Sequence, residues 1–347
     1  MGQNRWISGY IIATIITFLQ CEDIKMRDSP RQSCINLNVR ENIMRSSLEC
    51  PKAESPHQEC SPEQYSKSRW GTDNYVEYQP GSTSSKIILL VPHGGYEMPK
   101  HIPKRVNGCR INGECIYSHS CPNVGESTDC SAGWTGSDEY TLKLSNAIAD
   151  SVHTITGYRP HLIANHLYRD RMDANRPMSK ATFMDQNAMT VWQEFHSYIE
   201  EAKSIVGTGL LLDIHAHGRR NNWIQLGYTL PGDDLNSETL LNASKSSVYH
   251  RSLHTGVPFE EFLRGNESLG GLFESNGYIT VPAPGLKGPG TEPFLAGGYN
   301  TMRHGSRHQG TIDAIQVEFP QYIRRYWKRY AHSVAESIVE FTKRWYQ

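Results

Sequence analysis

The chain has 347 residues, which is long enough for one large domain with extensions or for two modest domains. Its 35 basic and 36 acidic side chains nearly cancel, so charge gives no reason to expect nucleic acid or an anionic membrane as a partner. The 15 histidines are a more specific signal, because imidazole is the commonest protein ligand for zinc.

Residues 1–21 have the pattern of a secretory signal peptide. Arg5 supplies a positive charge, residues 7–19 are largely apolar, and polar sequence resumes at Gln20. The apolar stretch is short for a membrane span, although an uncleaved anchor is the alternative. We therefore expect a secreted protein with no membrane partner after signal removal. Two N-glycosylation acceptor patterns begin at Asn242 and Asn266, and both would suit surface loops of a secreted protein.

The eight cysteines indicate an oxidising compartment. Residues 22–80 are polar, contain three cysteines and show no sustained period, which predicts an irregular extension. An insertion at 104–133 contains four more: Cys109, Cys115, Cys121 and Cys130. These four predict a loop held by two disulfides in one of three pairings, and a structural zinc knuckle is the rival interpretation.

Strand-like and helix-like segments alternate from residue 81 to 347, which predicts a single α/β domain. We expect strands at 86–91, 161–165, 223–230 and 311–320, with the central strand in the stretch 210–218. We expect helices at 138–153, 185–206, 238–246, 258–263 and 322–346, the first with Ser137 or Asp138 as its cap. Residues 281–298 are rich in proline and glycine and predict a long loop over a site.

Two of these strands lead into histidines. Three leucines in the stretch 210–218 precede His215, and the strand at 86–91 leads to His93. Glu97 follows in a turn rich in glycine and proline. Two histidines and a glutamate are the ligand set of hydrolytic zinc sites that keep a position for water. We expect these three residues to bind one zinc ion, and a histidine that merely hydrogen-bonds in a polar loop is the alternative.

Five motifs carry a resemblance to a known family. They are Pro92-His-Gly-Gly-Tyr-Glu-Met-Pro99, Asp173-Ala-Asn-Arg-Pro177, Asp213-Ile-His-Ala-His217, Gly297-Gly-Tyr-Asn-Thr-Met-Arg303 and Gln316-Val-Glu-Phe319. In this order they resemble the N-formylglutamate amidohydrolase family. The resemblance implies a mixed central sheet flanked by helices, similar to the fold of the zinc carboxypeptidases and the phosphorylase/hydrolase-like proteins. The chain has Gly94 and Ala216 where the bacterial members usually have serine.

The resemblance implies the same three zinc ligands and adds a catalytic residue. Glu318 would take a proton from the activated water and pass it to the departing amine, a role worth about 10²–10⁴-fold in rate. The alternative for Glu318 is a paired carboxylate at the sheet edge. We expect Asp213 and His217 to lie behind the ligands rather than bind the metal.

The resemblance also implies how a substrate is held. Asn175 and Arg176 would clamp its α-carboxylate, for which a planar guanidinium is a suitable partner. The alternative for Arg176 is a structural bridge to Asp173. Arg303 would hold a second acidic group or the oxyanion.

These expectations together describe a secreted zinc-dependent amidohydrolase. Its partner would be a small N-acyl amino acid, similar to an N-formyl one, with a free carboxylate. A carboxypeptidase-like exopeptidase acting on short peptides shares every proposed site residue and is the first alternative. A secreted binding or matrix protein that keeps the fold without turnover is the second.

Overall fold

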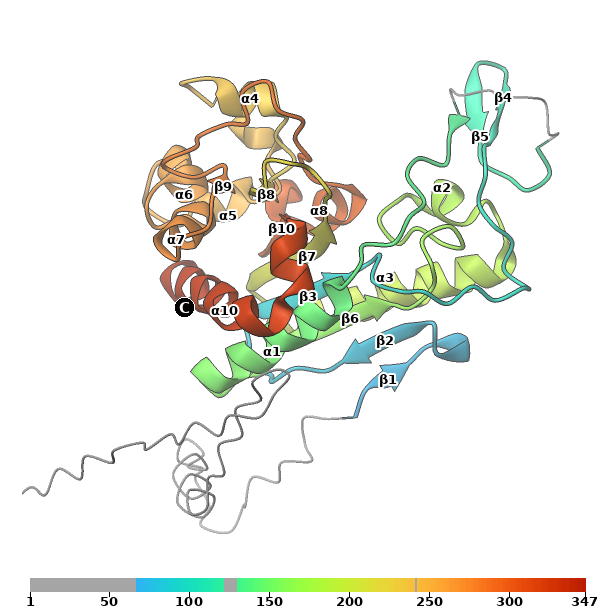
Figure 1. Cartoon of the computed structure of the whole chain (residues 1–347), viewed down its shortest axis with the longest axis horizontal. Coiled ribbons are helices and arrows are strands. Elements are labelled where there is room, and N and C mark those ends of the chain that lie inside the picture. The colour runs from blue at the N-terminus through green and yellow to red at the C-terminus, as the bar shows by residue number, and fades with distance from the viewer. Residues whose placement is uncertain (1–66, 122–129, 241) are drawn as a thin grey trace, which may run out of the picture. The chain divides into compact units, whose positions relative to one another are not determined.

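The computed structural model describes residues 67–121, 130–240 and 242–347 (Figure 1). The expected signal peptide and the first four cysteines lie outside the described residues. Within the described ranges, no helix combines the length and the apolar character needed to cross a bilayer.

The centre of the fold is a sheet of eight strands in the order β1-β2-β6-β3-β7-β10-β8-β9. The strands are β1 (Arg69–Trp70), β2 (Val76–Gln79), β3 (Ile87–Val91), β6 (His161–Asn165), β7 (Gly209–Ala216), β8 (Ile224–Gly227), β9 (Thr280–Val281) and β10 (Ile312–Phe319). Strands β6, β3, β7 and β10 are parallel, whereas β2 and β8 are antiparallel to their inner neighbours. The sheet is therefore mixed, as expected.

Helices connect the strands. The longer ones are α1 (Thr141–Thr156), α3 (Gln186–Val206) and α10 (Trp327–Trp345). The shorter ones are α2 (Met178–Thr182), α4 (Gly232–Asn236), α5 (Tyr249–Ser252), α6 (Phe259–Arg264), α7 (Leu269–Ser275), α8 (Tyr299–His304) and α9 (Gln321–Arg325), with 3-10 turns at Thr72–Asn74, Ala243–Lys245 and Ser306–His308. Asp185 caps α3 by accepting a hydrogen bond from the Ala188 amide.

Strand β3 shows why the central strands are apolar throughout. Ile87, Leu89 and Val91 lie in one core with residues of α1 and α10, whereas Ile88 and Leu90 lie in a second core with residues of α3. Helices α1 and α10 pack side by side (Figure 1). Because both faces of the sheet are covered, alternate residues are buried on opposite sides and no polar face remains.

The sheet begins before residue 81, which corrects the expected domain boundary. Strands β1 and β2 lie inside the stretch 22–80 that we expected to be irregular. Val76 and Tyr78 are buried, and Glu77 between them is almost buried as well. Strands this short leave too few residues for a periodic signal in the sequence.

Two other segments differ from expectation. The single helix expected at 322–346 is divided into α9 and α10 at Tyr326, whose backbone is not helical. In place of a helix at 238–246, the described residues contain only a 3-10 turn, and α4 lies before it.

The cysteine-rich insertion is held by two disulfides, as expected. They join Cys109 to Cys121 and Cys115 to Cys130, which selects one of the three pairings. Strands β4 (Cys109–Ile111) and β5 (Glu114–Ile116) form a small separate hairpin, and each strand contains one cysteine of a disulfide. The zinc-knuckle interpretation is wrong, because all four sulfurs are bonded to one another in pairs.

A buried carboxyl group on β10 predicts a pH-dependent stability. Burial raises the pKa of Asp313 to about 7, although a hydrogen bond from the Tyr346 hydroxyl at 2.6 Å opposes that shift. The folded chain therefore holds a proton that the unfolded chain releases near pH 4, so this contribution to stability falls as pH rises to about 7. The slope for one such group is at most about 1.4 kcal/mol per pH unit.

Replacing Asp313 with asparagine should remove this loss. We expect Asp313→Asn to gain stability relative to the wild type between pH 5 and pH 8, measured as the free energy of unfolding in denaturant. Asp233→Asn, at an exposed site, is the matched control and should change little. An equal pH dependence in the wild type and Asp313→Asn would contradict the assignment.

Candidate active site

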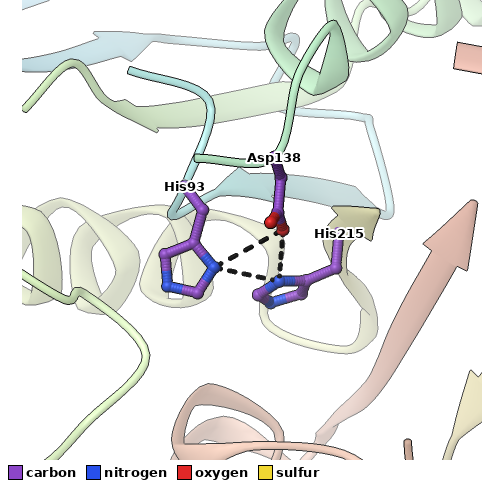
Figure 2. A group of neighbouring side chains, drawn as sticks. All are labelled: His93, Asp138 and His215. Atoms are coloured by element: carbon purple, nitrogen blue, oxygen red, sulfur yellow. Dashed lines mark hydrogen bonds and ion pairs between the residues drawn. The ribbon is translucent and has the colours of Figure 1, made fainter. Parts of the chain in front are cut away.

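Three side chains from distant parts of the sequence meet at one point (Figure 2). His93 Nδ1 lies 3.1 Å from His215 Nδ1. The Asp138 carboxylate lies 3.0 Å from His215 Nδ1 and 3.5 Å from His93 Nδ1, measured from Oδ2. All three side chains are buried. Two imidazole nitrogens and one carboxylate oxygen therefore face a common centre.

The sheet and one loop bring these residues together. His93 follows β3 and His215 lies near the carboxyl end of β7, and β3 and β7 are parallel neighbours. Side chains at the carboxyl ends of parallel strands meet at the same edge. Asp138 arrives from the loop before α1, and its amide donates to the His93 carbonyl at 2.9 Å.

The other nitrogen of each imidazole lies next to a further carboxylate. His93 Nε2 lies 2.6 Å from Asp173 Oδ1, and His215 Nε2 lies 3.1 Å from Asp213 Oδ2. Carboxylates in these positions fix the orientation of histidines that bind metals. The prediction that Asp213 lies behind His215 agrees with this contact.

The charges of the site follow from burial and from these pairs. Burial alone would lower the pKa of His215, but Asp213 and Asp138 raise it well above its usual value. Burial would raise the pKa of Asp138, but the two histidines hold it well below its usual value. The pKa of Asp173 is likewise depressed despite complete burial, through Arg169 and His93.

The donor set fits a metal ion. Bonds of about 2.0–2.1 Å in a tetrahedron place two ligand atoms roughly 3.3 Å apart. The separations here are 3.1, 3.0 and 3.5 Å, close to that value on every side. Among the described residues, this trio is the group of histidines and carboxylates that can hold an ion.

Glu97 is not part of this group, which corrects the expected ligand set. Its side chain is exposed, and its backbone pairs with the segment around Leu167. The Glu97 amide donates to the His166 carbonyl at 2.9 Å, and the Glu97 carbonyl accepts from the Tyr168 amide at 2.8 Å. Asp138, and not Glu97, supplies the carboxylate that lies with the two histidines.

Glu318 lies beside the metal-binding group. Glu318 is on β10, where it pairs in register with His215 of the neighbouring parallel strand β7. Burial raises its pKa to about 7, and the charge of His215 opposes that shift. Gln316 Nε2 donates to Glu318 Oε1 at 2.9 Å, whereas Oε2 has no hydrogen-bond partner among the described residues. Glu318 is thus placed as a carboxylate that can exchange a proton.

A cavity of about 660 Å³ opens onto this group. Asp138, His215 and Glu318 line it, together with Asn175 and Arg176. Its volume lies in the range of about 300–1,000 Å³ typical of small-molecule sites.

The expected substrate clamp is only partly available. Asn175 is buried and engaged, because its Oδ1 accepts from the Asn300 amide at 2.8 Å and its Nδ2 lies 3.1 Å from His215 Nε2. Arg176 donates one hydrogen bond to the Asn175 carbonyl at 3.0 Å and lines the cavity. Its contact with Asp173 is loose, at 4.0 Å.

Arg303 is not in the cavity. Its side chain is exposed and lies over the rings of Trp192 and Tyr299, and it donates to the Tyr299 hydroxyl at 2.7 Å. Arg303 is on α8, a short helix that sequence reasoning did not predict, and the helix turns this side chain outwards.

Sequence reasoning missed two carboxylates of the site. Asp138 was weighed only as a cap of α1, but Tyr140 occupies that position and the Asp138 side chain faces the histidines. Asp173 begins one of the five motifs, and that position was a signal for a role in the site. It was weighed only as a partner of Arg176.

Several solved structures are similar to this chain. The N-formylglutamate amidohydrolase from Ralstonia eutropha JMP134 is 11% identical, with a TM-score of 0.41 over 73% of this chain and 94% of that chain.

Two further structures are similar to this chain. The gene product Atu2144 from Agrobacterium tumefaciens is 12% identical, with a TM-score of 0.41 over 77% of this chain and 94% of that one. The N-acetylmuramoyl-L-alanine amidase AmiC2 of Nostoc punctiforme is 14% identical, with a TM-score of 0.27 over 74% of this chain and 96% of that one. No protein-family model and no curated protein sequence matches this chain.

Proposed function

We propose that this protein is a zinc-dependent hydrolase that cleaves the amide bond of a small N-acyl amino acid with a free carboxylate. One observation carries the proposal. Two members of the metal-binding group, Asp138 and His215, line the same cavity as the carboxylate of Glu318 and the guanidinium of Arg176. The five sequence motifs, which resemble an amidohydrolase family, support the same reaction class.

The residues divide the chemistry between them. His93, Asp138 and His215 would hold zinc, which supplies Lewis acidity for activating water and polarising an amide carbonyl. Glu318, which lines the cavity, accepts a proton from the attacking water on its carboxylate and returns that proton to the nitrogen of the departing amine.

Arg176 orients the substrate. Its donors in the cavity can bind a carboxylate, and guanidinium–carboxylate pairs are among the stronger hydrogen-bonded ion pairs in proteins. Asn175 is already committed to Asn300 and His215, so it shapes the wall beside the metal-binding group. A carboxylate held on Arg176 would fix the neighbouring amide bond within the same cavity as Glu318.

Metal removal tests the proposal. Chelation should reduce the release of free amino acids from N-formyl and N-acetyl substrates to the background rate, and one equivalent of zinc should restore it. Magnesium, which prefers oxygen ligands, should not restore it. Release that persists in metal-free protein would contradict the proposed chemistry. Cleavage of dipeptides in preference to acyl amino acids would instead favour the exopeptidase.

We also propose that the protein is secreted. The disulfides Cys109–Cys121 and Cys115–Cys130 support this location, because disulfides persist in oxidising compartments. Expression of the full chain in cells that process signal peptides should deliver it to the medium, with a new amino terminus near residue 21. Retention of an uncleaved chain inside the cells would count against secretion.

A further inference from the structure

The cavity has an unusually exposed tryptophan in its wall. Trp134 lines the cavity, and 73% of the residue's surface is accessible. A large aromatic side chain presented in this way offers a flat apolar surface to whatever the cavity holds. The proposed chemistry at Glu318 and Arg176 gives this ring no role.

The segment that carries Trp134 is tied down. Cys130 is bonded to Cys115, and the Cys130 carbonyl accepts from the Gly108 amide at 2.8 Å. The indole rests on Gly136, where an added methyl group would lie 2.9 Å from the ring. The same short segment ends at Asp138, so the backbone that carries the ring is anchored at one end by the disulfide and leads at the other into the metal-binding group.

Trp134 is close to the proposed carboxylate clamp. A methyl group added to Gly133 would lie 3.9 Å from Nη2 of Arg176, so the backbone just before Trp134 borders the guanidinium. In an amino acid, the carboxylate and the side chain leave the same carbon atom. The amide nitrogen leaves that carbon as well. A substrate whose carboxylate binds Arg176 and whose amide bond faces Glu318 therefore leaves its side chain to face the remaining wall of the cavity, which includes Trp134.

A second apolar wall of the cavity is also fixed. Leu295 lines the cavity, and its amide donates to Gln225 Oε1 at 3.0 Å. The neighbouring Ala296 carbonyl accepts from the Thr229 amide at 2.6 Å. The loop that carries these residues is therefore anchored on β8.

Arg303, the residue expected to hold an acidic group of the substrate, lies outside the cavity. Apart from Arg176, the arginines that line it among the described residues are Arg169, which is paired with Asp173, Arg324, which donates to the Glu139 carbonyl, and Arg219. Binding of an acidic side chain is therefore one of the outcomes that the test below separates.

We propose that the amino-acid half of the substrate has an aromatic or large apolar side chain, which packs on Trp134. This inference rests on the proposed function, because it takes Arg176 as the site of the substrate carboxylate. It names the substrate class within that function as N-acyl derivatives of aromatic or large apolar amino acids.

Equilibrium binding tests the inference without requiring turnover. Zinc-loaded Glu318→Gln protein is titrated by calorimetry with the N-acetyl derivatives of phenylalanine, leucine, glycine and glutamate. We expect the phenylalanine derivative to bind about 10–100-fold more tightly than the glycine derivative. Adding Trp134→Ala should reduce that ratio to within about threefold, while Trp134→Phe should retain most of it.

The control and the contrary outcomes are specific. Trp70→Ala removes another exposed tryptophan, which lies on β1 and does not line the cavity, and should leave the ratio unchanged. Equal affinities for all four ligands, tightest binding of the glutamate derivative, or equal weakening of all four by Trp134→Ala would each overturn the inference. Selective binding without turnover in the wild type would contradict the proposed function alone.

Discussion

Glu318→Gln should abolish turnover while leaving the metal content and the fold unchanged. Glutamine has nearly the same shape and keeps an oxygen that can accept the hydrogen bond from Gln316 Nε2, but it cannot accept a proton at neutral pH. We expect kcat to fall by about 10²–10⁴-fold. Release of amino acid from an N-acyl substrate measures the loss, and metal analysis measures the zinc content.

The burial of Glu318 predicts that this substitution does not reduce the stability of the fold. Because burial raises the pKa of Glu318 to about 7, the ionised carboxylate is unfavourable in that position and its removal should not destabilise the chain. Glu340→Gln, at an exposed position of α10, is the matched control and should keep full activity. Activity of Glu318→Gln near that of the wild type would exclude Glu318 as the proton carrier.

Strands were predictable where burial left a continuous apolar pattern. In β3 and β7 both faces are covered, so every residue is apolar until the sequence reaches the site. The change from leucine to Asp213 and His215 marks the carboxyl end of β7, and that end is where a parallel sheet presents functional side chains. The positions of His93 and His215 beside each other follow from the pairing of those two strands.

The third member of the metal-binding group, the carboxylate of Asp138, was not predictable in the same way. A spacing of four residues between His93 and Glu97 does not determine where either side chain points, because the turn between them has no regular period. Asp138 reaches the histidines through contacts between distant segments, namely its bond to the His93 carbonyl and the disulfide-held insertion before it. Such contacts leave no periodic trace in the sequence.

The insertion has a structural consequence for the site. One disulfide-anchored segment, which starts at Cys130, supplies both the cavity tryptophan Trp134 and the carboxylate Asp138. Trp134, Ser137 and Asp138, which follow the insertion at 104–133, line the cavity, and Asp138 is one of the three metal-binding side chains.

Substitutions at Asp138 and Glu97 should separate the two possible ligand sets. Asp138→Asn removes the negative charge that faces both histidines, at distances of 3.0 and 3.5 Å. We expect zinc affinity to fall by more than about a hundredfold, which exceeds the roughly 10–100-fold loss seen when only an outer partner of a ligand is removed. Competition with a chelator of known affinity measures the change.

Glu97→Gln is the matched control, because the carboxylate it removes is exposed and does not belong to the metal-binding group. It should leave zinc affinity within about twofold of the wild type, a range expected of surface substitutions. Cobalt in place of zinc adds an independent readout, since its visible spectrum reports the ligands directly: the spectrum should change in Asp138→Asn and stay constant in Glu97→Gln. If zinc binding is lost in Glu97→Gln and kept in Asp138→Asn, the ion is held by Glu97, and the geometry of His93, Asp138 and His215 is not that of the metal-bound protein.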